Sequence, residues 1–198
     1  MKENIAIERQ TNSQKKIKAA FIQLTREKGF DSLTVTDIAR QARINRGTFY
    51  RHYVDKYDLL EQLKADIYKE LQKIFLNDMY QEEAHADLIP YQTILKAITY
   101  LQENFLLIAT LASSNGDPNF MVDVKSIIKE LITSRIQKEN DFHLSTQDLP
   151  MEYAIEVLIS SVTSVINLWI QRGGQESPEE VANIIFKAKS LAPKDLLI

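Results

Sequence analysis

Cysteine is absent from the 198-residue chain, which excludes a disulfide framework and any zinc site built on thiolates. Long hydrophobic runs are absent as well. We find no stretch of 18 apolar residues, so we expect no membrane span. The first twelve residues are polar and do not resemble a signal peptide. These absences together favour a protein of the cytoplasm.

Recognisable catalytic motifs are missing too. The sequence has no Gly-rich phosphate loop, no Gly-x-Ser-x-Gly and no paired-carboxylate motif. Its three histidines, His52, His85 and His143, are far apart, and none lies in a metal or nucleophile motif. We therefore expect no catalytic site, no metal and no cofactor; an all-helical enzyme without a recognisable site is the alternative. One segment could ligate a metal, although a solvated acidic loop is the simpler interpretation: Glu82, Glu83, His85 and Asp87.

Glycine and proline number only five each, and strand signals are scarce. Apolar residues recur at steps of three and four over most of the chain, which indicates amphipathic helices. We expect helices from 56 to about 79, from Pro90 to Phe105, from 120 to 136 and from 151 to about 171. The run 105–111 is apolar all round and should be deeply buried. The pattern predicts an all-α fold.

The last two expected helices have the clearest start and stop signals. Pro150 opens the first of them, and Gly173–Gly174 ends it. Ser177-Pro-Glu-Glu180 then supplies a capping serine, a proline at the first helical position and a glutamate for a capping box. The first helix is apolar over more than half of its circumference, which favours a second face that meets another copy of the chain. The alternative is that both faces are filled within one chain.

Charge is distributed unevenly along the chain, whose net charge is −3. Residues 1–64 hold 13 Lys/Arg and 8 Asp/Glu, a net of +5, whereas residues 65–198 hold 11 and 19, a net of −8. A basic N-terminal part on an acidic remainder suits a DNA-binding head and a body that avoids phosphates.

The segment from Leu33 to Lys56 has the pattern of two short helices joined by a tight turn. Thr34 or Thr36 can cap the first helix, and Asn45 can cap the second. Phe49 should face a core of three helices. This is the geometry of a helix-turn-helix, in which the second helix enters the major groove and the first lies across the DNA backbone.

The residues of that second helix suit DNA as a group. An arginine can read guanine with two hydrogen bonds, a threonine methyl can contact thymine, and a glycine lets the backbone approach a base edge. Tyrosine, histidine and lysine near the helix end suit phosphates, which fix register without specifying sequence. Taken singly, most of these residues would be interpreted as ordinary surface or packing residues. Their grouping favours DNA.

The segment from about Ser13 to Leu63 resembles the N-terminal DNA-binding domain of the TetR/AcrR family of bacterial transcriptional regulators. The resemblance rests on five stretches: Ala19–Leu24, Lys28–Val35, Asp37–Ala39, Gly47–Tyr50 and Lys56–Leu60. It implies a helix-turn-helix DNA-binding domain over 1–55 and a helical effector-binding and dimerisation domain over 56–198. By position, it implies base contacts from Asn45, Arg46, Gly47 and Thr48, and phosphate contacts from Thr36, Tyr50, His52 and Lys56.

One departure from the family pattern lies in the turn, where Arg43 stands at a position that usually holds glycine. Glycine would relieve a left-handed backbone conformation there. Arginine must bear that strain or avoid it, and it could add a phosphate contact.

Members of this family dimerise through their last two long helices as a four-helix bundle, which implies a homodimer. Two heads are also needed to reach successive major grooves about 34–36 Å apart. More narrowly, residues 173–182 resemble a subgroup common in low-GC Gram-positive bacteria that includes regulators of dihydroxyacetone kinase operons. The residues expected at the dimer interface are Ile155, Leu158, Ile159, Val162, Val165, Ile166, Trp169, Val181, Ile184 and Ile185.

The resemblance also implies a small-molecule effector that enters a cavity among the middle helices and repositions the heads. Such an effector must bind the conformation that releases DNA more tightly than the other, or it shifts nothing. Few charges fall inside the apolar runs, so we expect a neutral or hydrophobic ligand. The candidate lining residues, which could also be ordinary core residues, are Tyr68, Phe75, Tyr91, Tyr100, Phe105, Phe120, Met121 and Trp169.

The sequence therefore predicts a homodimeric repressor that binds a double-stranded DNA operator. A transcriptional activator or co-regulator controlled by a protein partner is one alternative. A helical adaptor that binds only protein is another. Duplex DNA affinity that falls with salt distinguishes a regulator from an adaptor or an enzyme.

Overall fold

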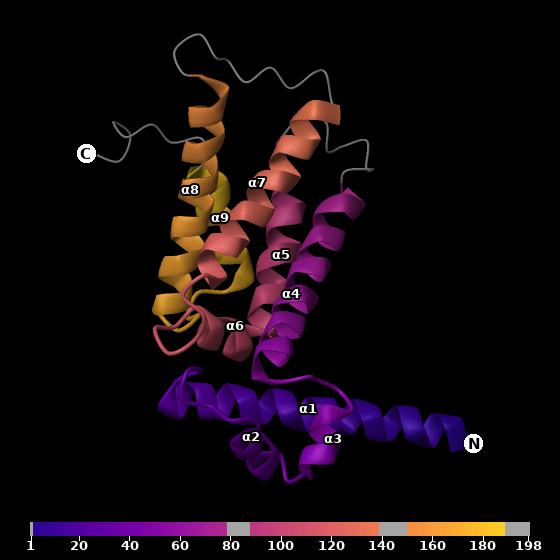
Figure 1. Cartoon of the computed structure of the whole chain (residues 1–198). Helices are drawn as coiled ribbons and strands as arrows, with labels where there is room; N and C mark the ends of the chain where they lie inside the picture. The colour runs from indigo at the N-terminus through magenta and orange to yellow at the C-terminus, as the bar shows by residue number, and fades with distance from the viewer. Residues whose placement is uncertain (1, 79–87, 139–149, 189–198) are drawn as a thin grey trace. The chain divides into compact units, whose positions relative to one another are not determined.

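The computed structural model describes residues 2–78, 88–138 and 150–188 of the chain. Every regular element in these ranges is a helix (Figure 1), which confirms the all-α prediction. In chain order the helices are α1 (Lys2–Lys28), α2 (Val35–Gln41), α3 (Arg46–Tyr50), α4 (Lys56–Asp78), α5 (Tyr91–Glu103), α6 (Phe105–Leu111), α7 (Phe120–Lys138), α8 (Met151–Gln171) and α9 (Pro178–Ala188).

The chain divides into two compact units. The first, here called the head unit, comprises Met1–Asp66 and Leu106–Pro118. The second, the body unit, comprises Ile67–Phe105 and Asn119–Ile198. The division by compactness therefore falls inside α4. The expected boundary between residues 55 and 56 concerns function and stays a prediction.

Three helices of the head unit pack together: α1 against α2 and α3, and α2 against α3. Figure 1 shows α1 lying across both short helices. Burying a large apolar side chain stabilises a fold by about 1.5–3 kcal/mol, so this small core can hold a five-residue helix in place. Phe49 faces this core, as its position in the pattern predicted. The core centres on side chains with at most 2% exposure: Ile17, Phe21, Leu33, Ile38 and Phe49.

A segment from the middle of the chain, 106–118, completes the head unit. The backbone N–H of Phe30 donates to the carbonyl oxygen of Asn115 at 2.9 Å. The ammonium of Lys64 on α4 lies 2.7 Å from a carboxylate oxygen of Asp117, and both side chains are buried. Gly116 is required sterically, because an added Cβ would lie 2.1 Å from the carbonyl oxygen of Thr110.

The expected deep burial of the apolar run 105–111 is correct for only part of it. Leu107, Ile108 and Leu111 are buried, whereas Leu106 is 52% exposed. The run forms α6, and a seven-residue helix turns one side toward a core and the other toward solvent. An all-apolar sequence carries no periodicity from which the buried side could be predicted.

In the body unit, α5 packs against α9, α7 against α8, and α8 against α9. The turn between α8 and α9 matches the predicted signals. Gly173 and Gly174 have positive φ, and their N–H groups donate to the carbonyls of Ile170 and Trp169 as a Schellman motif requires. The expected capping box is present, because Ser177 N–H donates to the Glu180 carboxylate at 2.8 Å and Glu180 N–H donates to the Ser177 hydroxyl at 3.2 Å.

Helix α8 departs from the expectation that nothing in the chain could span a membrane. By length and composition it passes such a test, with a mean hydropathy of 1.5, and α5 and α6 pass it when taken together. Hydroxyl residues interrupt its apolar run, but two of these hydroxyls donate to backbone carbonyls of the preceding turn: Ser161 to Leu158 and Thr163 to Ile159. A search for unbroken apolar residues overlooks such a helix. The core helix of a water-soluble protein passes the same test, and one face of α8 is buried against its neighbours.

Candidate nucleic-acid interface

The first helix of the motif, α2, begins at a polar cluster around Asp37. Thr34 is the N-cap, as one of the two predicted candidates, and its hydroxyl accepts from Asp37 N–H at 3.1 Å. The Asp37 carboxylate pairs with Lys28 at 2.6 Å and with Arg40 at 2.8 Å. The hydrogen bonds from Lys28 and then Thr34 lower the pKa of Asp37 to about 2. Thr36, the expected phosphate contact, is exposed in the first turn of α2.

The second helix, α3, is five residues long and depends on its cap. Asn45 is the N-cap, as predicted, and its side-chain oxygen accepts from Thr48 N–H at 2.7 Å and from the Thr48 hydroxyl at 3.0 Å. Gly47 fits beside this oxygen, since an added Cβ would lie 3.3 Å from it. The cap therefore fixes the first turn of the helix expected to read bases.

The side chains of α3 form an exposed polar face. Arg46 Nη2 donates to the Tyr50 hydroxyl at 3.2 Å, with the guanidinium 5.7 Å from the centroid of the Tyr50 ring. Arg51 Nη2 donates to the Thr48 hydroxyl at 3.2 Å. Asn45, Arg46, Gly47 and Tyr50 are exposed and Thr48 is half-buried. The four expected base contacts thus lie together at one helix end, where charged and amide groups can meet the edges of base pairs.

The turn before α3 is strained, because Arg43 has a φ of 53°. This is the left-handed region, which costs an L-residue about 1–2 kcal/mol. Of the two possibilities that the sequence left open, arginine bears the strain.

Two of the expected phosphate contacts are engaged inside the head unit. His52 is half-buried, and its Nε2 lies 2.7 Å from the Ser13 hydroxyl on α1. Burial, and then the neighbouring Arg51 charge, lower the pKa of His52, which favours the neutral ring. Lys56 donates to the carbonyl oxygens of Phe30 at 3.1 Å and Asp31 at 2.8 Å. An ammonium has three N–H donors, so one remains for a phosphate.

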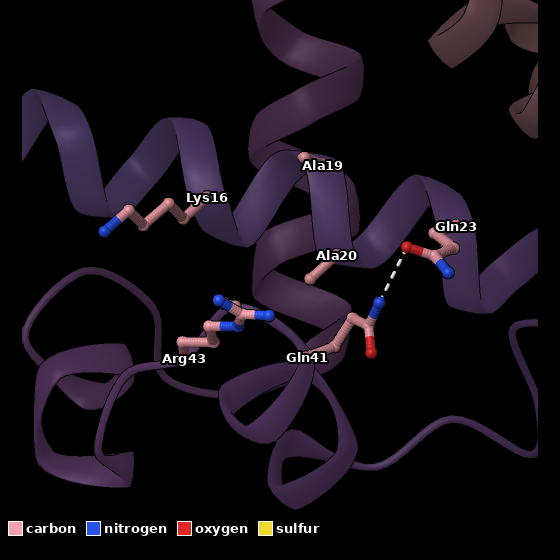
Figure 2. Close-up of a pocket in the computed structure, with 7 residues that line it drawn as sticks. Lys16, Ala19, Ala20, Gln23, Gln41 and Arg43 are labelled. Atoms are coloured by element: carbon pink, nitrogen blue, oxygen red, sulfur yellow. Dashed lines mark hydrogen bonds between the residues drawn. The ribbon is translucent and has the colours of Figure 1, made fainter.

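Sequence reasoning did not single out Lys16. It lies on α1, and the fold brings it to the same pocket as Arg43 (Figure 2). The two residues are far apart in the chain, so no local motif contains both. The one available signal was that Lys16 is a lysine of α1 to which no motif assigns a role.

The expected effector-site aromatics form separate ring pairs in the body unit. Tyr68 and Phe120 are stacked with centroids 6.3 Å apart, and the Tyr68 hydroxyl donates to Asp123 at 3.3 Å. Phe105 packs edge-on against Trp169 at 5.3 Å, and Tyr91 packs edge-on against Phe186 at 5.8 Å. The remaining candidates are half-buried: Phe75, Tyr100 and Met121.

Most of the expected dimer residues are occupied within one chain. A side chain with 7% exposure or less has almost no surface left for a partner, and seven of the ten are of this kind: Ile155, Ile159, Val162, Ile166, Trp169, Val181 and Ile185. The Trp169 indole also donates to the carbonyl of Glu176 at 3.1 Å. Leu158 and Val165 are half-buried, and Ile184 is 47% exposed. The apolar side chains that α8 does expose are Tyr153, Val157 and Leu168.

Metal-ligating residues do not gather within the described ranges, where no group of three or more His, Cys, Asp or Glu side chains could hold an ion. The segment with Glu82, Glu83, His85 and Asp87 lies outside the described residues, as does His143.

The chain is similar to known protein families and to individual known proteins. Residues 17–63 match the family model described as bacterial regulatory proteins, tetR family, and residues 90–189 match that of a transcriptional regulator C-terminal region. The chain is 24% identical over 164 residues to the HTH-type dhaKLM operon transcriptional activator DhaS of Lactococcus lactis, with 81% of each chain covered.

Solved structures show the same fold. A TetR transcriptional regulator from Streptococcus agalactiae matches with a TM-score of 0.63 and 22% identity, covering 94% of this chain and 98% of that one. The dihydroxyacetone kinase operon activator DhaS matches with a TM-score of 0.60 and 22% identity, covering 90% and 94%. At such identities the likeness concerns the fold alone.

Proposed function

Because the chain belongs to the TetR family of bacterial regulatory proteins, we propose that it is a homodimeric repressor that leaves its operator when a small hydrophobic effector binds. Family membership itself makes the chain a DNA-binding transcriptional regulator with a helix-turn-helix. The sign of regulation, the effector and the individual contacts belong to the proposal.

The observation that carries the proposal is the capped, exposed first turn of α3. The base contacts that we propose are the Asn45 cap and the three residues that follow it at this end, Arg46, Gly47 and Thr48. Thr36 and Tyr50 are exposed and suit phosphates. His52 and Lys56 contribute mainly by holding the helices of the head unit together, with one N–H of Lys56 left for a phosphate.

The dimer interface that we propose uses the outer faces of α8 and α9. Val157 and Leu168 on α8 and Ile184 on α9 are exposed apolar side chains on helices that already pack together. Ser164 is exposed between the two α8 residues, and small side chains let two helices approach closely. A second copy would cover these side chains and place two heads on successive major grooves.

We further propose that residues 1–55 bind DNA and that residues 56–198 bind the effector and dimerise. The ring pairs of the body unit support an apolar binding region, because aromatic side chains dominate pockets for apolar ligands. A regulator of this family needs no catalytic activity and acts where the chromosome lies, so we propose a non-enzymatic, cytoplasmic protein.

Activation of transcription is the second candidate function. It is favoured by the likeness to DhaS, which is named as an activator of an operon. An activator and a repressor use the same α3 contacts and differ in where the operator lies relative to the promoter.

The test is fluorescence anisotropy of the purified protein against its own upstream intergenic DNA, with a scrambled duplex as control, at two salt concentrations. We expect tight binding to the intergenic duplex that weakens with salt. Arg46→Ala should lose about 1–3 kcal/mol of preference at one base pair per half-site. Arg26→Ala, which removes an exposed arginine of α1, is the matched control.

Two outcomes would contradict the proposal. Equal weak binding of both duplexes would contradict operator recognition at that site. An unchanged base preference of Arg46→Ala in a binding-site selection would contradict the assignment of Arg46. A promoter–reporter fusion then decides between repression and activation.

A further inference from the structure

The head unit has an open pocket of about 320 Å³ between α1 and the turn that precedes α3. Three of its lining residues have small side chains, Ala19, Ala20 and Ala42. Figure 2 shows Lys16 and Arg43 at one end and the hydrogen-bonded pair Gln23 and Gln41 at the other. The lining carries two positive charges and no carboxylate.

The glutamine end of the pocket is fixed in place. Gln41 Nε2 donates to Gln23 Oε1 at 2.7 Å, and Gln23 Nε2 donates to Glu27 at 2.8 Å. The Glu27 carboxylate is therefore hydrogen-bonded to the Gln23 amide. Among the described residues, neither Lys16 nor Arg43 has a carboxylate within ion-pair distance. Both cations remain available for an anion from outside the chain.

The backbone at Arg43 is a second, independent observation. Its φ of 53° is strained for any residue except glycine. Strain of this kind persists at functional sites, and an observed outlier is a reason to look for function. Here the strained residue projects a guanidinium that lines a basic pocket, which a glycine could not do.

The location of the pocket in the head unit indicates which anion it would bind. Arg43 lies two residues before Asn45, the cap of α3. Two residues of extended chain span at most about 7 Å, so a lining residue of the pocket lies close to the helix end that we propose to meet the bases. DNA presents phosphates along both edges of the groove that such a helix enters.

We propose that Lys16 and Arg43 form a clamp for one phosphate of the DNA backbone flanking that groove. The clamp rests on the proposed DNA contacts of α3 and adds a contact that reaches from the turn to α1. A guanidinium binds phosphate through two parallel N–H groups and an ammonium binds it as a point charge. The contact strengthens binding and fixes register without reading sequence.

The test uses the full chain with Lys16→Gln, Arg43→Gln and the double variant. Arg26→Gln is the matched control, because it removes one exposed charge from α1 outside the pocket lining. Binding is measured by anisotropy over a potassium chloride series, on the duplex preferred by the wild type and on a scrambled duplex. Circular dichroism confirms that each variant is folded, and Lys16→Gln tests the clamp without touching the strained turn.

We expect the double variant to flatten the slope of log K against log salt by about 2 on both duplexes, because each phosphate contact contributes about 0.9 and the proposed dimer carries two clamps. The affinity should fall roughly tenfold at moderate salt, while the order of preferred sequences stays the same. A slope equal to that of Arg26→Gln would overturn the clamp.

The two proposals can fail separately. If the wild type binds both duplexes equally, operator recognition fails, and the salt slopes on the scrambled duplex still decide the clamp. If the slopes of wild type and double variant agree, but inorganic phosphate at matched ionic strength weakens DNA binding only in the wild type, the pocket binds free phosphate and the assignment to DNA is overturned. A wild type that binds neither duplex overturns both.

Discussion

A single carboxylate, that of Asp37, holds the start of α2. It accepts from Lys28, Arg40 and the Thr34 backbone and hydroxyl groups. These bonds favour the charged form and lower the pKa of Asp37 to about 2 in the folded chain, from about 4 in an unfolded one. Its stabilisation is therefore fully present above about pH 4 and is lost as the pH falls toward 2.

Asp37→Asn should lower the stability of the head unit at neutral pH, and the difference from wild type should shrink below pH 4. The amide keeps the size of the side chain and removes its charge. Urea unfolding between pH 3 and pH 7 measures this, with Asp31→Asn as a control at an exposed position of the loop before α2. A difference that stays constant over this range would mean that the ion pairs do not stabilise α2.

At Arg43 the backbone and the side chain can be separated by two substitutions. Arg43→Ala removes the guanidinium and keeps the left-handed strain, whereas Arg43→Gly removes both. We expect the glycine variant to be more stable than the alanine variant by about 1 kcal/mol, as measured by urea unfolding. Equal stabilities would show that the turn relaxes to another conformation in the alanine variant.

Residue roles that depend on neighbours in sequence were predictable, and those that depend on the fold were not. The caps at Thr34 and Asn45 follow from the residue type at a helix start. The partners of Lys56 are carbonyls of the loop before α2. Nothing near Lys56 in the sequence indicates that these carbonyls lie within its reach, so the sequence predicted the phosphate contact and not these two hydrogen bonds.

At the scale of elements, the α8–α9 turn shows how little chain is needed to join two helices. Two glycines end α8, a capping box starts α9, and the indole of Trp169 bonds across the turn. All these devices are local, which is why the sequence predicted both helix ends.

The residues of the proposed dimer face could not be predicted in the same way. Helical periodicity identifies apolar positions of α8, but it does not tell which of them α7 and α9 already cover.

The two glycines of this turn differ in what an added methyl group would meet. Gly173 has a φ of +81° and open space, whereas at Gly174, with a φ of +67°, a Cβ would lie 2.6 Å from the Phe105 ring. Gly173→Ala should cost about 1 kcal/mol from backbone strain. Gly174→Ala should cost clearly more, because the Phe105–Trp169 contact must also shift. Thermal unfolding of the two variants measures the comparison, and equal costs would contradict the placement of Phe105.

At the scale of the whole molecule, the head unit depends on a segment encoded far from α1–α3. Lys64 contacts both Asp117 of that segment and the exposed Glu61 of its own helix. Breaking a buried ion pair from one side typically costs about 3–5 kcal/mol, whereas an exposed pair contributes less than about 1 kcal/mol. The Lys64 ammonium therefore allows the contribution of a buried partner, Asp117, to be compared with that of an exposed partner, Glu61.

Asp117→Ala should strongly destabilise the head unit, and Glu61→Ala should barely affect it. Amide hydrogen exchange of α1–α3 is the suitable measurement, because it reports the head separately from the rest of the chain. The distant segment would be dispensable to the head if exchange in α1–α3 were unaltered by Asp117→Ala.

The bond from Phe30 N–H to Asn115 also orders events during synthesis. A ribosome releases the chain from its N-terminus at about 5–20 residues per second, so α1 to α3 emerge well before their last partners do. Until residue 118 has left the ribosome, the nascent head lacks the carbonyl that binds Phe30 and the carboxylate that binds Lys64. The part of the regulator that is made first is therefore completed late, and a gene truncated after α4 would encode the DNA-reading helix without the whole of its support.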